Sequence, residues 1–94
     1  GMRMNIIILD GSVMTSRERA YKHIARELRF PEYFGKNLDA LYDLLTDLYV
    51  NEDTIVILTN CRKMKKSLGE YGDKLIDVFA NASEEKGFIF IVKE

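Results

Sequence analysis

The sequence predicts an α/β fold, a single small domain in which three to four helices cover a three-stranded parallel sheet. Three short, uniformly apolar segments predict the strands, at residues 5–9, 54–59 and 88–92. Helical patterns separate these segments in the order β-α-α-β-α-β, and strands joined through helices pair in parallel. The chain has 94 residues, which suits one domain with one modest core. Gly1 is interpreted as the remnant of an expression tag, so the domain is expected over residues 2–94.

The first third of the chain predicts a strand and a helix. The segment NIIILD, Asn5–Asp10, is a continuous apolar run, which is typical of a strand buried on both faces of a parallel sheet. Thr15 and Glu18 have the spacing of a capping box, with Thr15 at the N-cap position. Apolar residues then recur at helical intervals, so we expect a helix over 16–28 that ends before Pro31.

The second helix, expected over 37–49, has the most unusual charge pattern in the chain. Asn37 is a favourable N-cap residue, and at 100° per residue the helix has two distinct sides. The leucines expected to be buried are Leu41, Leu45 and Leu48. The aspartates expected to be exposed on the other side are Asp39, Asp43 and Asp47. No lysine or arginine occurs from Asn37 to Thr54, so nothing nearby in the sequence neutralises these acids.

The aspartates of this helix allow two interpretations. Like charges four residues apart destabilise an isolated helix by a few tenths of a kcal/mol per pair, and Asp43 belongs to two such pairs. Asp39 lies in the first turn, where the helix dipole stabilises a carboxylate, but Asp43 and Asp47 lie too far along to benefit. The aspartates form either an ordinary solvated surface or a binding face for a cationic partner.

The C-terminal half predicts two strands around one long helix. The segment TIVILT at 54–59 is expected to be a central strand. The basic segment 60–66 is expected to be a loop with at most one turn of helix. An apolar stripe then predicts a helix over 70–84, which Gly87 can terminate as a C-cap before the last strand.

Charge and composition exclude several classes of protein. The net charge is −1, and the basic residues gather in two segments, 17–29 and 62–66, without an overall basic excess. Such a protein is a poor candidate for nucleic-acid binding through phosphate neutralisation. The single cysteine, Cys61, excludes an internal disulfide, and the apolar run at 6–9 is too short for a signal-peptide core or a membrane span. We therefore expect a cytoplasmic protein that binds neither nucleic acid nor membrane directly.

The sequence contains no motif for catalysis, for a metal or for a cofactor. Gly69 and Gly72 match neither of the glycine-rich phosphate loops. Cys61 has no neighbouring histidine to activate its thiol, and His23 lacks the companions that a metal site requires. The three aspartates lie on one helix, whereas a hard cation usually draws ligands from several elements. We expect a binding domain without cofactor or metal, and not an enzyme.

The segment PEYFGKNLDALYDLLTD, residues 31–47, resembles the signature of the barstar family. Members of this family are intracellular bacterial inhibitors of ribonucleases. The rest of the chain agrees more loosely, for example in the V-F-x-x-A run at 78–82. The resemblance implies a barstar-like fold and a partner ribonuclease with a basic active-site cleft that binds RNA phosphates. In the family, the loop and the helix that follows it plug this cleft, and a helix carboxylate takes the place of a phosphate.

The resemblance also implies a set of partner-binding residues. The carboxylate that replaces a phosphate corresponds to Asp43, and a second acidic contact corresponds to Asp39. The implied contact residues are Tyr33, Phe34, Gly35, Asn37, Leu38, Asp39, Tyr42, Asp43, Thr46 and Asp47.

The chain departs from the family's namesake at several positions. Phe34 lacks a tyrosine hydroxyl, Tyr42 stands where the namesake has a larger tryptophan, and Asp47 stands where it has glycine. The namesake's distal acid aligns best with Asn81, with Glu84 and Glu85 nearby. These departures leave open an alternative, a barstar-like binding or immunity module for another toxin nuclease or for a non-nuclease protein. We expect the unbound protein to be monomeric.

Overall fold

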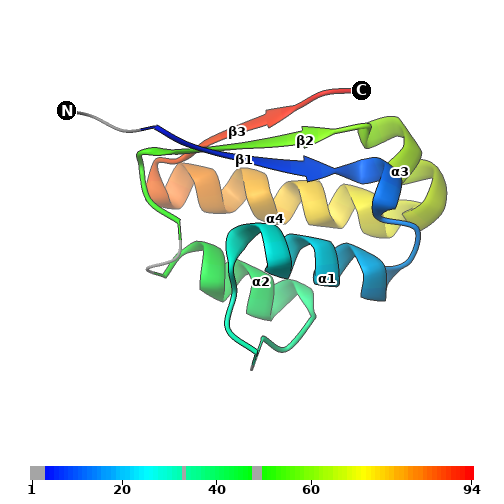
Figure 1. Ribbon diagram of the computed structural model, residues 1–94, viewed down its shortest axis with the longest axis horizontal. Coiled ribbons are helices and arrows are strands. Elements are labelled where there is room, and N and C mark those ends of the chain that lie inside the picture. Colours follow the sequence, from blue (N-terminus) through cyan, green and yellow to red (C-terminus); the bar gives the residue numbers. More distant parts are fainter. Residues whose placement is uncertain (1–3, 33, 48–49) are drawn as a thin grey trace.

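The computed structural model describes residues 4–32, 34–47 and 50–94, and Figure 1 shows how their helices and strands are arranged. In chain order the elements are β1 (Asn5–Asp10), the 3-10 helix η1 (Gly11–Val13), α1 (Arg17–Leu28), α2 (Leu38–Leu45), β2 (Thr54–Thr59), α3 (Cys61–Leu68), α4 (Glu70–Lys86) and β3 (Ile89–Val92). None of the helices in these ranges is both long and apolar enough to cross a membrane.

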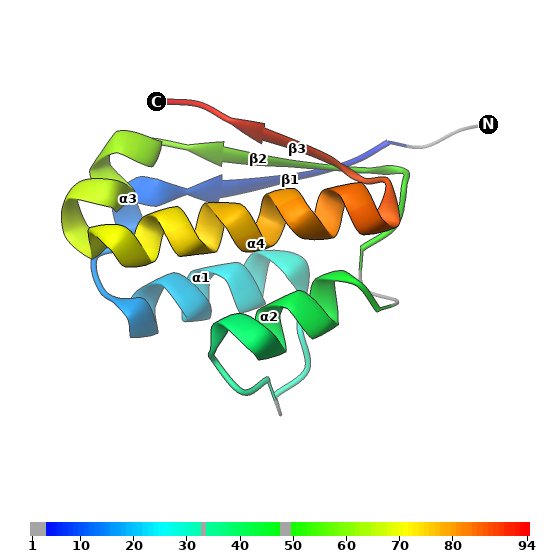
Figure 2. The same cartoon turned by 180° about the vertical axis from the view of Figure 1, so that it is seen from behind.

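The three strands form one parallel sheet in the order β1-β2-β3. Ile7 of β1 pairs with Val56 of β2, which pairs in turn with Phe90 of β3. Helices α1, α2 and α4 lie together on one side of this sheet, and α3 lies at the end where β1 and β2 finish (Figures 1 and 2). The predicted fold class, a three-stranded parallel sheet with three to four helices, is confirmed.

The core fills the space between the sheet and the helices. Leu9, Val56 and Leu58 point inward from the strands and are at most 3% exposed. Leu9 and Leu58 surround the same small gap as Ile24 of α1 and Phe79 of α4, so sheet and helices interlock there. Burial of each such side chain stabilises the fold by about 1.5–3 kcal/mol.

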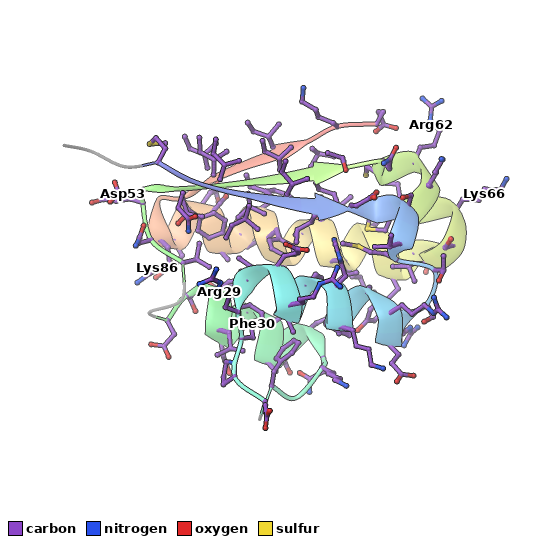
Figure 3. All side chains as sticks on the ribbon, in the orientation of Figure 1. Arg29, Phe30, Asp53, Arg62, Lys66 and Lys86 are labelled. Atoms are coloured by element: carbon purple, nitrogen blue, oxygen red, sulfur yellow. The ribbon has the colours of Figure 1, made fainter. Side chains whose placement is uncertain are left out.

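The opposite face of the sheet is covered by no helix of the described residues, and the expectation that the strands are buried on both faces is wrong. Ile6 and Ile8 of β1 are 58% and 54% exposed, and Ile89 of β3 is 47% exposed. Figure 3 shows carbon-rich side chains standing on this face. The cause is the strand order. Right-handed crossovers that both move across the sheet in the same direction place their helices on the same face.

Helix α1 begins one residue later than its capping box predicts. The N–H of Arg19 donates to Ser16 Oγ at 3.1 Å, so Ser16 is the N-cap and not Thr15. At the other end Arg29 takes a left-handed conformation (φ 57°), which stops the helix before Pro31 as expected. Both ends therefore follow from local sequence, with an error of one residue at the start.

The basic segment that was expected to be a loop forms the helix α3, so that expectation is wrong. Cys61 and Met64 are buried, and Leu68 is half-buried, at the helical spacing i, i+3, i+7. This apolar stripe is short, and the basic residues between its members obscure it in the sequence. Helix α4 follows Gly69 and ends at Gly87, whose left-handed conformation (φ 82°) confirms the predicted C-cap.

Candidate functional site

The loop between α1 and α2 is anchored in the core by an aromatic side chain. Phe34 is only 7% exposed, although it was predicted to contact a partner. Its ring packs edge-on against Phe30 at 5.1 Å and against Tyr21 of α1 at 5.6 Å between centroids. The structure therefore places Phe34 under the loop, where it positions its neighbours and offers little surface of its own. Its neighbour Tyr33 lies outside the described residues.

The aromatic contact continues from Phe34 to the start of α4. The hydroxyl groups of Tyr21 and Tyr71 share a hydrogen bond, and the guanidinium of Arg17 lies 3.9 Å from the centre of the Tyr71 ring. Burial, and then the bond to Tyr71, raise the pKa of Tyr21 well above its usual range, so this phenol stays protonated. These residues, which the sequence alone does not single out, tie the loop to α1 and α4.

Asn37 connects the loop to α2. The N–H of Ala40 donates to Asn37 Oδ1 at 2.7 Å, and Asn37 Nδ2 donates to the carbonyl of Gly35 at 3.3 Å. Asn37 is thus the predicted N-cap, and both ends of its amide are already bonded. A side chain at Gly35 would crowd Ala40 at 3.3 Å, while the left-handed residue of this turn is Lys36 (φ 53°). Gly35 is therefore favoured by close approach and not by a positive φ.

Helix α2 has the two sides that its sequence predicts. Leu41 and Leu45 are fully buried, as expected, and Leu44 is buried beside them. The helix ends at Leu45, and the expected extension to residue 49 is too long. Thr46 is its C-cap. The hydroxyl of Thr46 also donates to the carbonyl of Asp43 at 3.3 Å, and the N–H of Asp47 bonds to Leu44 instead of continuing the helix through Asp43. Residues 48 and 49, including the leucine predicted to be buried, lie outside the described residues.

The acidic face of α2, defined as Asp39, Asp43 and Asp47, is exposed to solvent, as predicted. Among the described residues none of these carboxylates forms an ion pair, whereas Glu18 and Asp73 elsewhere pair with lysines at 3.7 and 3.4 Å. Asp39 is in the first turn, where the helix dipole favours it. Asp43 and Asp47 gain nothing from the dipole, so folding alone does not account for their charges.

The remaining predicted contact residues surround this face to different degrees. Gly35 and Asn37 are exposed, and Leu38, Tyr42 and Thr46 are half-buried. The hydroxyl proton of Thr46 is already donated within the helix. Tyr42 is consequently the aromatic residue on α2 that can offer both ring and hydroxyl to a partner.

A shallow hollow of about 170 Å³ lies beside Asp43. It is lined by Phe34, Gly35, Ala40, Asp43 and Leu44. Ala40 and Leu44 were not predicted as site residues, although their spacing from Asp43 along a helix places them on adjoining positions. The hollow combines apolar walls with one carboxylate, a shape that can receive the stem and charge of a partner's lysine or arginine.

The three residues that correspond to the namesake's distal acid, or lie near that position, are exposed. Asn81, Glu84 and Glu85 all lie exposed on α4, the helix that packs against α2. The figures place α2 and α4 side by side in both views (Figures 1 and 2). No described contact links these three side chains to the acidic face, so their part in binding stays a prediction.

The potentially reactive groups lie away from α2. Cys61 is buried at the start of α3, and burial raises the pKa of its thiol, which makes it a poor nucleophile. His23 accepts a hydrogen bond at Nε2 from the N–H of Asp10 at 2.9 Å, and burial lowers its pKa, so it is neutral near pH 7. Within the described ranges no three histidine, cysteine or acidic side chains are grouped so that they could hold a metal ion.

Two comparisons with known proteins agree on one family. The family described as "Barstar (barnase inhibitor)" matches residues 4–93 of the chain. A protein of Bacillus subtilis (strain 168), "Putative ribonuclease inhibitor YrdF", is 37% identical over 82 residues, which are 87% of this chain and 89% of that protein. The family match extends over the sheet, the loop and α2 together.

Proposed function

The chain belongs to the barstar family, and on that premise we propose that it is a protein inhibitor of a microbial ribonuclease. It acts by inserting the acidic face of α2 and the preceding loop into the basic active-site cleft of the enzyme. The observation that carries the proposal is the set of exposed aspartates of the acidic face, which form no ion pair among the described residues.

The charges on α2 support a role outside folding. Asp39 and Asp43 are a like-charged pair at helical spacing, which destabilises a helix by roughly 0.2–0.5 kcal/mol, and Asp47 adds a third carboxylate just beyond the end of the helix. A cluster that opposes folding is stabilised when a partner brings compensating cations to it. A ribonuclease cleft supplies these cations because it binds the phosphates of RNA.

The positions of the aspartates suggest a different role in binding for each one. Asp43 stands beside the hollow under the loop, where a partner's cation would be surrounded and desolvated. We assign it the place of a phosphate and assign Asp39, one turn earlier, a second contact. Asp47 follows the end of the helix and would act as a rim charge, which alters association more than affinity.

The inhibition requires no chemistry from this chain. The family's inhibitors are non-catalytic, and the proposed block is steric and electrostatic, without cofactor, metal or direct contact to RNA. We propose that residues 2–94 act as one barstar-like domain. By its resemblance to the family, the inhibitor would act in the cytoplasm, where it protects the RNA of the producing cell.

A titration against a panel of secreted microbial ribonucleases tests the proposal. The wild-type chain is expected to inhibit at least one enzyme of the panel stoichiometrically. Asp43→Asn should weaken that inhibition by roughly 2–5 kcal/mol, because buried cations of the enzyme lose their partner. Asp53→Asn is the matched control, since Asp53 is an exposed acid at the start of β2, away from α2 (Figure 3). Equal inhibition by wild type and Asp43→Asn would contradict the proposal.

The alternative, a module for another toxin nuclease or a non-nuclease protein, draws on two departures that the structure leaves accessible. Tyr42 is half-buried and Asp47 is exposed, so both would alter the surface that a partner meets. A chain that inhibits no ribonuclease of the panel, yet captures a different nuclease through α2, would establish this alternative.

A further inference from the structure

The face of the sheet opposite the helices carries a regular array of isoleucines. Strand register places Ile6, Ile55 and Ile89 in one row and Ile8, Ile57 and Ile91 in the next. We call these six residues the isoleucine face. Among the described residues no helix covers them, and Figures 1 and 2 show all the helices below or beside the sheet.

The isoleucine face is more apolar than a solvated sheet requires. Ile6 and Ile8 are more than half exposed, Ile91 is 38% exposed, and the central Ile55 and Ile57 are half-buried between their neighbours. A sheet with one face in water usually alternates apolar and polar residues along each strand. Here the strands stay apolar on both sides. A contiguous apolar patch of this kind marks an interaction surface.

We propose that the isoleucine face is the dimer interface of this protein, and that a second copy of the chain occupies it. The isoleucine face is uncharged and uniform, so it is complementary to itself. Two such faces can stack as sheets do in a sandwich, about 10 Å apart. A two-fold axis between them makes the contact closed, with the same residues used on both copies. The proposal replaces the monomer that we expected from the sequence.

The charges at one end of the face favour a second copy and fix its orientation. The next row beyond the isoleucines begins with Asp10 of β1, which pairs in register with Thr59 of β2. Lys93 completes this row after the end of β3, because its N–H donates to the carbonyl of Leu58 and its carbonyl accepts from the N–H of Cys61. This row therefore has an acid at the β1 edge and a base at the β3 edge. A two-fold axis parallel to the strands places β1 over the partner's β3. Asp10 then faces the partner's Lys93, and Lys93 faces the partner's Asp10.

The groups at this rim are suited to such a pairing. Asp10 Oδ1 accepts bonds from the N–H and the hydroxyl of Ser12 and from Asn60 Nδ2, which hold the carboxylate in place. These hydrogen bonds lower the pKa of Asp10, so it is ionised at neutral pH. Lys93 is exposed and forms no ion pair with any residue that the structure describes.

The size of the face predicts a weak dimer. Three strands about 4.8 Å apart, which are six, six and four residues long at about 3.3 Å per residue, outline roughly 250 Å². The side chains project from the sheet and add to this area. Even so, two copies would bury an area near the lower limit for specific interfaces, about 1,000 Å² in total. The dimer should consequently form in a concentration-dependent way. The helices separate this face from α2, so each copy keeps its acidic face free (Figures 1 and 2).

Sedimentation velocity from low micromolar to near-millimolar concentration tests the proposal. The wild-type mass should rise from monomer to dimer. Ile8→Lys should raise the dissociation constant by at least about tenfold, because two charges would be desolvated within the contact. Val13→Lys is the matched control, since Val13 is an apolar residue 44% exposed on η1, away from the face. Its dimerisation should equal that of wild type, and a thermal melt of each variant checks that it is folded.

A charge reversal tests the orientation. Lys93→Glu should weaken the dimer several-fold, and salt should reduce the difference from wild type. Lys63→Glu, an exposed position on α3, should not weaken it. A wild-type protein that stays monomeric throughout would overturn the proposal, as would a dimer insensitive to Ile8→Lys or a face that proves to bind vesicles or a different protein. A dimer that Lys93→Glu leaves unchanged would overturn the two-fold axis parallel to the strands.

Discussion

Helices α2 and α3 are both eight residues long, and each buries one side, yet their charges are opposite in sign and differ in what they do for the fold. In α3, Lys65 and Lys66 lie in the last turn, where the helix dipole favours cations, and Lys65 also pairs with Asp73 at 3.4 Å. In α2 the aspartates continue to the C-terminal end, where the dipole disfavours them. Lys65 and Lys66 are therefore favourably placed in α3, whereas Asp43 is unfavourably placed in α2.

The comparison teaches how to distinguish a solvated charged face from a binding face. Sign and number of charges are uninformative alone, because α3 carries more charged residues than α2. What differs is how many of the charges have a partner or a favourable position within the chain. In α3, Arg62 and Lys65 form ion pairs and Lys66 lies in the last turn, whereas Asp43 and Asp47 have neither among the described residues. By this criterion the acidic face of α2 is the better candidate for a function.

The largest expected effect tests what the two helices share. Leu45→Ala in α2 and Met64→Ala in α3 should each destabilise the protein by about 2–5 kcal/mol, because both side chains are fully buried and leave a cavity. Urea unfolding followed by circular dichroism measures this. If either substitution proved harmless, that helix would not be held by its apolar side.

The next largest effect is a loss of binding that substitution in α2, but not in α3, should cause. Asp43→Ala should weaken binding to a responsive ribonuclease by about 2–4 kcal/mol, whereas Lys66→Ala, on the exposed side of α3, should leave binding unchanged (Figure 3). Stopped-flow association at increasing salt should also show a falling on-rate for wild type. Similar losses from both substitutions would mean that charge alone, and not its position on α2, determines binding.

A smaller effect is a loss of stability at low pH, which arises where α3 begins. Asn37 caps α2 with its side chain, but Asn60, in a left-handed conformation, gives α3 no such bond and instead donates to Asp10. Asp10 is held in turn by His23, because the backbone N–H of Asp10 donates to His23 Nε2. Protonation of His23 would remove this acceptor and loosen the start of α3.

The pH dependence follows from the lowered pKa of His23. Its ordinary value is 6.5, and the folded state holds it below that, so the unfolded chain takes up the proton first as pH falls. The contribution to stability is complete above about pH 6.5 and is lost progressively as the pH falls through the lower, folded value. Urea titrations at several pH values should show this loss, and His23→Gln should lack it. A wild-type profile that is flat between pH 7 and 5 would contradict the assignment.

The smallest effect sharpens the contrast in charge. Asp47→Asn should stabilise the protein by roughly 0.2–0.5 kcal/mol, because it relieves repulsion with Asp43 near the negative end of α2. Lys65→Gln should instead destabilise it by up to about 1 kcal/mol, since it removes an exposed ion pair with Asp73. Thermal melts at low salt measure both changes. The same sign for both would remove the distinction between the two helices.

Local chemistry in the sequence determined the elements and the candidate site. The apolar segments are strands, Asn37 is the cap of α2, Gly87 ends α4, and helical periodicity separated Leu41 and Leu45 from the aspartates correctly. These features depend on residues within a few positions of one another. A cap bond, a positive φ and a periodic stripe are all properties of a short segment, so the sequence contains them in full.

Only the tertiary structure decided which surfaces are free. Phe34 belongs to a signature that predicts contact, yet its ring packs in the core against Tyr21 of α1, and no local sequence pattern links these two residues.

The strands were uniformly apolar, and that pattern does not distinguish a covered face from an open one. Ile6 and Leu9 belong to the same run, but one is 58% exposed and the other 1%. The strand order β1-β2-β3 with right-handed crossovers placed α1, α2 and α4 on a single face, and that long-range choice left the isoleucines uncovered.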